Sequence, residues 1–265
     1  MKPFEIFKAK STAHVIVLTK MKAQRYIEID LLRGLAIILM IIFHFGYNLN
    51  FFKLISINPF NGIWLVIARA VQFIFVLSTG LTLYISYKRR LRRGVKDAIL
   101  SRLNHSAKLL FFAMLITLVT WLLYDEQAVK FGILHFYSIS IPLGLLFVRF
   151  TYLAPPVAIA ILLLSPWITN LATESPILFP VGITNQFFQS LDYFPLFPWF
   201  GLFLCGIYLG AILYPEGIAR FSFNKALDYK IFKPLRFLGD KSLQIYLLHQ
   251  PILATSVLIY VAIMK

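Results

Sequence analysis

The chain has 265 residues, of which 59% are hydrophobic, 16% aromatic and only 14% charged, with a mean hydropathy of +0.77. A soluble domain of this length is closer to half apolar and a quarter charged, so the composition excludes an ordinary soluble enzyme. The formal net charge is +15, but nucleic acid is not an expected partner because no soluble domain is left to grip it. The sequence predicts an all-α, polytopic transmembrane helix bundle.

The N-terminal residues 1–25 are predicted to form a basic cytosolic extension, followed by a transmembrane domain over residues 26–265. A membrane span needs about 20 mostly apolar residues. About seven segments meet this criterion, and the fifth is the weakest because three prolines interrupt it. The predicted spans are 31–52, 63–87, 107–124, 131–149, 152–171, 196–214 and 242–263.

Lysine and arginine predict the orientation. With the N-terminus in the cytosol, segments 1–28, 88–108, 149–151 and 215–241 lie inside and together hold 21 of these residues, whereas three lie outside. This asymmetry follows the positive-inside rule. We therefore expect a multi-pass protein of the cell membrane with a cytosolic N-terminus and an extracytoplasmic C-terminus.

The first span contains an unusual pair of ionisable residues in RGLAIILMIIFH (33–44). Arg33 and His44 are eleven residues apart, which on a helix is about 16 Å of rise and a net rotation of only ~20°. Both side chains therefore share one face. Arg33 could simply extend to the lipid head groups, but His44 lies too deep for that, and an ionisable residue at such a depth usually marks a functional site.

Other polar residues are expected at a similar depth. His249 belongs to the last span, Arg69 and Gln72 to the second, and His135 to the fourth, while Asp192 precedes the sixth span on the outside. Each could be a hydrogen-bonded packing residue. Together they suggest a polar interior that opens toward the outside.

The chemistry of this set narrows the choice of function. Histidine can act as a general base or as a nucleophile, and arginine can orient an acid or stabilise an anion. The sequence has no His/Cys/Asp cluster at metal-ligand spacing, so no metal is expected. It also lacks a phosphate-binding glycine loop and a G-x-S-x-G motif. The remaining options are histidine-based group transfer and proton-coupled transport.

A stripe of small residues, GIYLG (206–210), lies in the sixth span. Two glycines four residues apart permit close approach of another helix. Packing within the chain is the first interpretation, and a homodimer is the alternative.

Five blocks of the chain resemble a known family. They are YIEIDLLRGLAIILMIIFH (26–44), FIFVLSTGLTLYIS (73–86), FGILHF (131–136), YFPLFPWFGLFLCGIYLG (193–210) and LGDKSLQIYLLHQP (238–251). In this order they resemble the heparan-alpha-glucosaminide N-acetyltransferase catalytic-domain family of transmembrane acyltransferases, as a small prokaryotic member. The opening block is also similar to the acyltransferase-three family, whose first span carries an arginine and a histidine at the spacing of Arg33 and His44.

The resemblance implies an integral membrane acyltransferase that moves an acyl group, in the first place acetyl, from cytosolic acetyl-CoA. The acceptor would be an extracytoplasmic amine or hydroxyl, such as a sugar or glycolipid of the envelope. The implied catalytic residues are His44 and His249, with Arg69 and Asp192 as further candidates. The lysosomal member has Asn at the position of His44, so its heparan sulfate substrate is not carried over, and it does not support a catalytic role for His135.

The cofactor-binding residues expected for acyl-CoA are Arg33 and the basic run of the second inside segment, Arg89, Arg90, Arg92 and Arg93. The competing interpretation of the basic run is orientation in the membrane and contact with lipid head groups. The alternative function is a transporter or flippase of a small molecule or glycolipid. A non-catalytic membrane scaffold is a third class.

Overall fold

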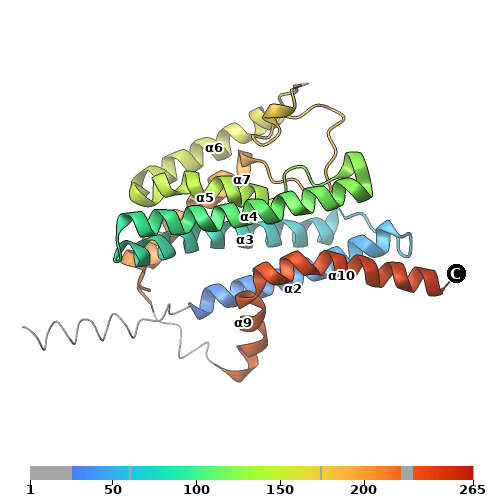
Figure 1. Cartoon of the computed structure of the whole chain (residues 1–265), viewed down its shortest axis with the longest axis horizontal. Helices are drawn as coiled ribbons and strands as arrows, with labels where there is room; N and C mark the ends of the chain where they lie inside the picture. The colour runs from blue at the N-terminus through green and yellow to red at the C-terminus, as the bar shows by residue number, and fades with distance from the viewer. Residues whose placement is uncertain (1–25, 60, 174, 222–228, 265) are drawn as a thin grey trace, which may run out of the picture.

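The structure, a computed structural model, describes residues 26–59, 61–173, 175–221 and 229–264. The extension predicted over residues 1–25 lies outside the described residues. The described chain forms eight α-helices joined by short 3₁₀ turns and loops (Figure 1), which confirms the all-α prediction. The helices are α2 (Ile27–Phe51), α3 (Gly62–Leu91), α4 (Val95–Tyr124), α5 (Ile133–Arg149), α6 (Ala154–Thr169), α7 (Leu196–Leu213), α9 (Lys233–Asp240) and α10 (Ser242–Ile263).

Six stretches of the described chain are long and apolar enough to cross a membrane, namely α2, α3, α7 and α10, together with α4 and α6 extended by their adjoining 3₁₀ turns. The remaining predicted span, 131–149, corresponds to α5, which is apolar but has only 17 residues. The prediction of a multi-pass helix bundle is therefore confirmed. Two details differ: α4 begins twelve residues before the predicted span, and α9 was not predicted.

Both differences have the same cause. The first three turns of α4 carry Lys96, Asp97 and Arg102, and α9 carries Lys233 and Arg236, so neither stretch is apolar enough for a hydropathy criterion to detect. Helix propensity does not oppose helix in either segment, because arginine and lysine are good helix formers.

Large apolar side chains cover the outer faces of the spans. Phe111, Leu122, Leu146 and Trp167 are each more than 60% exposed. Exposed apolar surface on this scale suits a lipid environment, since soluble proteins rarely tolerate it.

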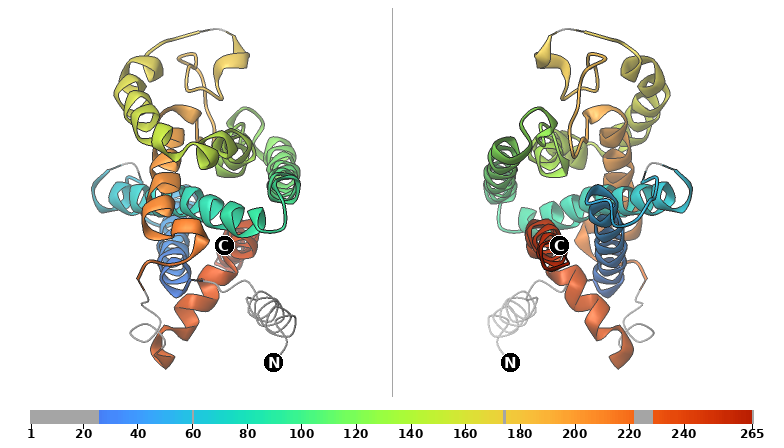
Figure 2. Two further views of the ribbon diagram at one scale, coloured as in Figure 1. Left: turned by 90° about the vertical axis from the view of Figure 1, so that its left-hand side faces the viewer. Right: turned by 90° about the vertical axis from the view of Figure 1, so that its right-hand side faces the viewer.

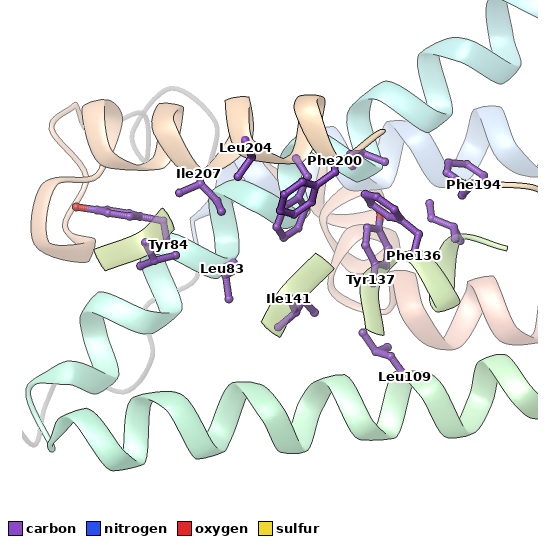
Figure 3. Close-up of a cluster of buried hydrophobic side chains, with 14 of the residues drawn as sticks. Leu83, Tyr84, Leu109, Phe136, Tyr137, Ile141, Phe194, Phe200, Leu204 and Ile207 are labelled. Atoms are coloured by element: carbon purple, nitrogen blue, oxygen red, sulfur yellow. The ribbon is translucent and has the colours of Figure 1, made fainter. Parts of the chain in front are cut away.

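The main core lies where α3, α4, α5 and α7 meet (Figure 3). Phe136 of α5 and Phe203 of α7 are fully buried there, with ring centroids 6.1 Å apart in an edge-to-face arrangement. Such aromatic pairs contribute about 0.5–1.5 kcal/mol beyond their buried area.

Glycines allow α3 and α7 to approach closely. A Cβ on Gly80 would collide with the carbonyl oxygen of Phe203, and one on Gly206 would collide with the carbonyl oxygen of Leu77. The GIYLG stripe therefore packs on α3 within the same chain, as its first interpretation predicted.

The helices α2, α9 and α10 form the other side of the molecule (Figures 1 and 2). The helix α10 lies beside α2 and packs mainly against it, and α9 crosses α2 at a steep angle. The crossing depends on Gly34 and Gly239, since a Cβ on either would meet backbone of the other helix. The last span of the chain is thereby held against the first.

Candidate active site

Two imidazoles face each other across the α2–α10 interface. The ring centroids of His44 and His249 lie 4.8 Å apart, with an angle of 60° between the ring planes. His249 is buried and His44 is half-buried. The structure thus brings together the two histidines that the sequence singled out, although they are far apart along the chain.

The interface between these helices holds a concentration of unpaired polar atoms. Four buried atoms have no hydrogen-bond partner among the described residues: His44 Nδ1, His249 Nε2, Asn48 Nδ2 and Gln250 Oε1. Leaving such an atom unpaired costs about 1–3 kcal/mol, and native structures contain few of them. Four such atoms on one pair of helices make this interface the candidate site.

The tautomer of His249 follows from its other nitrogen. Its Nδ1 lies 2.6 Å from the backbone carbonyl oxygen of Tyr246, which can only accept a hydrogen bond. The Nδ1 atom must therefore carry the proton and donate it. In the neutral ring, the buried Nε2 then holds the lone pair and is able to accept a proton.

Tyr246 connects His249 to Asp192. The ring centroids of Tyr246 and His249 are 5.6 Å apart, and the Tyr246 hydroxyl donates a hydrogen bond to the Asp192 carboxylate. Burial raises the pKa of Asp192 to about 6, and hydrogen bonds from the Ile133 amide and from Tyr246 limit the rise. Asp192 therefore changes charge close to neutral pH.

The loop before α7 folds inward to place Asp192. Its neighbours pair with the segment before α5: Leu191 donates to the Gln127 carbonyl and Phe194 to the Phe131 carbonyl, at 2.9 and 2.8 Å. The carboxylate itself accepts from the Ile133 amide at 3.2 Å, at the N-terminus of α5. A helix N-terminus favours a negative charge. Tyr246 was not predicted as a site residue from the sequence, although its position one helical turn before His249 would have suggested it.

Arg33 is oriented into the protein rather than only toward the head groups. Its Nε donates to Ser78 Oγ at 3.2 Å and its Nη2 to Thr82 Oγ1 at 3.0 Å, which ties α2 to α3. The buried hydroxyl of Tyr137 on α5 feels the charges of both Arg33 and Asp192. Polar side chains therefore extend through the bundle from Arg33 toward Asp192.

The other residues proposed at this depth lie elsewhere. Arg69 is exposed on α3, where it donates to Gln72 and lies 5.9 Å from the ring centroid of Trp199. His135 is buried, with its two ring nitrogens 3.3 Å from the Gly132 amide and from the Thr117 hydroxyl. Both contacts of His135 are those of a packing residue, while a catalytic role for Arg69 stays a prediction.

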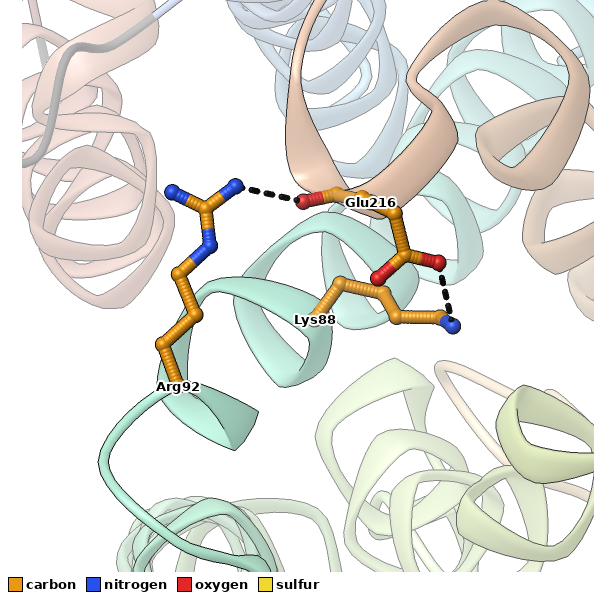
Figure 4. Close-up of polar contacts among 3 residues, drawn as sticks. All are labelled: Lys88, Arg92 and Glu216. Carbon is orange, nitrogen blue, oxygen red and sulfur yellow. Dashed lines mark hydrogen bonds and ion pairs between the residues drawn. The ribbon is translucent and has the colours of Figure 1, made fainter.

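The basic run at the end of α3 contacts the turn after α7 (Figure 4). Lys88 forms an ion pair with Glu216 at 2.9 Å, and Arg92 donates to the Glu216 carbonyl at 3.3 Å. Arg89 donates to the Gly217 carbonyl. Arg90 lies 3.8 Å from the carboxylate of Asp97 on α4. These contacts give the run a structural role, and Arg93 is exposed beside it.

A polar hollow lies along the first turns of α4, close to the same end of the bundle. It has a volume of about 560 Å³. Its polar lining includes Arg102, His105 and Lys108, and Arg33 of α2 acts electrostatically on His105. Sequence reasoning assigned this stretch to a cytosolic loop and therefore missed the hollow.

The described residues contain no group of three His, Cys, Asp or Glu side chains that could hold a metal ion. The site itself offers two imidazoles, a carboxylate and two amides. Together these groups can accept a proton and orient a polar substrate.

Comparison with curated proteins and with solved structures gave no match. Comparison with family descriptions gave one that covers most of the chain. Residues 25–251 match "Heparan-alpha-glucosaminide N-acetyltransferase, catalytic". The chain therefore belongs to the heparan-alpha-glucosaminide N-acetyltransferase catalytic-domain family, a family of membrane acetyltransferases.

Proposed function

We propose that this protein transfers an acetyl group from cytosolic acetyl-CoA to an amine or hydroxyl of an extracytoplasmic acceptor, such as a sugar or glycolipid of the cell envelope. The observation that carries the proposal is the pair His44 and His249, whose rings are in contact between α2 and α10 and each keep one buried nitrogen unpaired. Family membership supports acetyl transfer, and the positive-inside distribution supports a cytosolic N-terminus.

Positive charge at one end of the bundle favours binding of acetyl-CoA, the acetyl donor. The end of the bundle that holds the basic run also holds the polar hollow on α4. Phosphate groups of a coenzyme A are attracted to such a surface, and arginine binds phosphate with two parallel hydrogen bonds. Arg33, with Arg89, Arg90, Arg92 and Arg93 of the run, provides the positive field. Bound acetyl-CoA would supply the acetyl group as a thioester.

The histidines would move the proton of the acceptor. His249 is fixed by its hydrogen bond to the Tyr246 carbonyl, so its Nε2 is left free to act as a base beside the ring of His44. His44 would withdraw the proton of the attacking amine or hydroxyl and return it to the leaving sulfur, or would itself attack as the nucleophile. Asp192, through the Tyr246 hydroxyl, would hold α10 in register and stabilise positive charge on the imidazoles.

The polar atoms of the pair are covered by protein in this structure. A substrate would reach them by separation of α10 from α2, which is its main packing partner. Water exclusion of this kind protects a thioester from hydrolysis.

The test is turnover by the purified protein in lipid. We expect CoA release from acetyl-CoA that depends on an amino sugar or envelope glycan in the assay and yields the acetylated sugar. The His44→Ala protein should lose this activity while it keeps its melting temperature. Movement of a sugar or glycolipid across the membrane without consumption of acetyl-CoA would instead identify a transporter or flippase.

A further inference from the structure

A pair of amide side chains lies next to the two histidines. Gln250 Nε2 donates to Asn48 Oδ1 at 3.0 Å, which links α10 to α2. Asn48 is only 3% exposed. The remaining amino group of Asn48 and the remaining carbonyl of Gln250 are the two unpaired amide atoms of the interface.

This arrangement does not depend on which way the amides are turned. Rotation of both amides by half a turn exchanges donor and acceptor within the bond between them. One amino group and one carbonyl still remain unpaired, because each amide has two polar ends and the bond uses one of each. The pair therefore keeps one unpaired donor and one unpaired acceptor in either case.

A purely structural tie between helices would not need two amides. One polar side chain hydrogen-bonded to backbone is enough to link two membrane helices, and many do so without leaving buried atoms unpaired. A hydroxyl group matches the pair directly, since a single oxygen both accepts from the amino group and donates to the carbonyl.

The spacing fits a sugar. Asn48 follows His44 by four residues, which places it about 6 Å farther along α2. Gln250 directly follows His249 on α10. Both amides lie toward the C-terminal end of α2, where the predicted extracytoplasmic loops gather. A ring that presents its reacting amine or hydroxyl to His44 would carry another hydroxyl to the amides.

On these grounds, and resting on the proposed function, we infer that Asn48 and Gln250 form an acceptor subsite that recognises a ring hydroxyl of a sugar beside its acetylated group. The two residues determine which acceptor is used and take no part in proton transfer.

The experiment measures sugar binding to the full-length protein without acetyl-CoA. The probes are D-glucosamine and its 3-, 4- and 6-deoxy derivatives, and the readout is the shift of melting temperature with sugar concentration. We expect the wild-type protein to bind one deoxy derivative about tenfold or more weakly than glucosamine. In Asn48→Leu and Gln250→Leu, that derivative and glucosamine should bind equally.

Gln244→Leu is the matched control, because it makes the same change on an exposed part of α10 and should behave as the wild type. Gln250→Glu covers the case in which the leucine variants do not fold. Its carboxylate keeps the shape but would take up the amino group of Asn48, so discrimination between the sugars should again be lost.

Equal binding of all four sugars by the wild type, absence of binding, or unchanged discrimination in the Asn48 and Gln250 variants would each overturn the inference. A separate turnover assay keeps the proposed function distinct. If the protein discriminates between the sugars but transfers no acetyl group, the proposed function is wrong and the inferred subsite stands. If the protein transfers acetyl groups but does not discriminate between the sugars, the inferred subsite is wrong and the proposed function stands.

Discussion

The imidazole rings of His44 and His249 lie 4.8 Å apart, centroid to centroid, although one belongs to the first span and the other to the last. Close contact between two weak bases in a protein interior is unfavourable when both are charged. The pair is therefore suited to take up at most one additional proton, and so one positive charge, at a time, which is what a base that accepts and returns a proton requires.

Replacement of His44 by alanine is expected to lower the rate of acetyl transfer by about 10²–10⁴-fold, the usual contribution of a positioned acid–base group. The measurement is acceptor-dependent release of CoA per folded molecule. His135→Gln is the matched control, because His135 makes packing contacts only and its replacement should alter stability rather than turnover. Equal rates for His44→Ala and the wild type would contradict the proposed role.

The pKa of Asp192, raised by burial to about 6 from its ordinary value of 3.8, predicts opposite effects on activity and stability. The folded chain binds this proton more tightly than the unfolded chain, so the free energy of unfolding should gain a contribution as the pH falls from about 6 toward 3.8. Activity should fall over the same range, because the protonated acid is a weaker acceptor for the Tyr246 hydroxyl.

Asp192→Asn should remove both trends, and the two measurements are the pH dependence of turnover and of the melting temperature. A profile that keeps its acidic limb near pH 6 in the Asp192→Asn protein would assign that limb to another group.

Close packing of α3 on α7 predicts a large cost for any side chain at Gly80. Gly80→Val should destabilise the bundle by about 1–3 kcal/mol or more, since the carbonyl of Phe203 occupies the required space. Thermal unfolding in detergent measures the effect. Ala107→Val, on the exposed face of α4, should change stability little, and a similar loss in both variants would argue against the glycine contact.

Charge at the end of α3 is expected to attract the donor. Arg93→Gln should raise the KM for acetyl-CoA about two- to fivefold at low salt, the size of an exposed charge contact, and the difference should shrink as salt is added. Arg149→Gln, which removes a charge at the end of α5, is the control. An unchanged KM in Arg93→Gln would show that Arg93 does not attract acetyl-CoA. The basic run would then have only its structural contacts and its role in orientation.

Hydropathy was sufficient to locate the spans because each must present a long apolar surface to lipid. The depth of His44 and His249 in their predicted spans identified both as candidate site residues, but depth does not specify which face of a helix a side chain occupies. Arg69 shows the difference, since it lies on the exposed face of α3. The contact between Asp192 and Tyr246 could not be predicted, because it depends on the course of a loop that is fixed only by long-range packing.

The bond between Asn48 and Gln250 joins positions 202 residues apart. During synthesis, α2 enters the membrane before the other described helices and α10 after them, so α3 to α9 have to be made before the two histidines can meet. A chain that stops before α10 would carry His44 without its partner and, under the proposed function, would transfer no acetyl group. Under the proposed function, insertion of α10 beside α2 is thus the step in biosynthesis that first assembles the site.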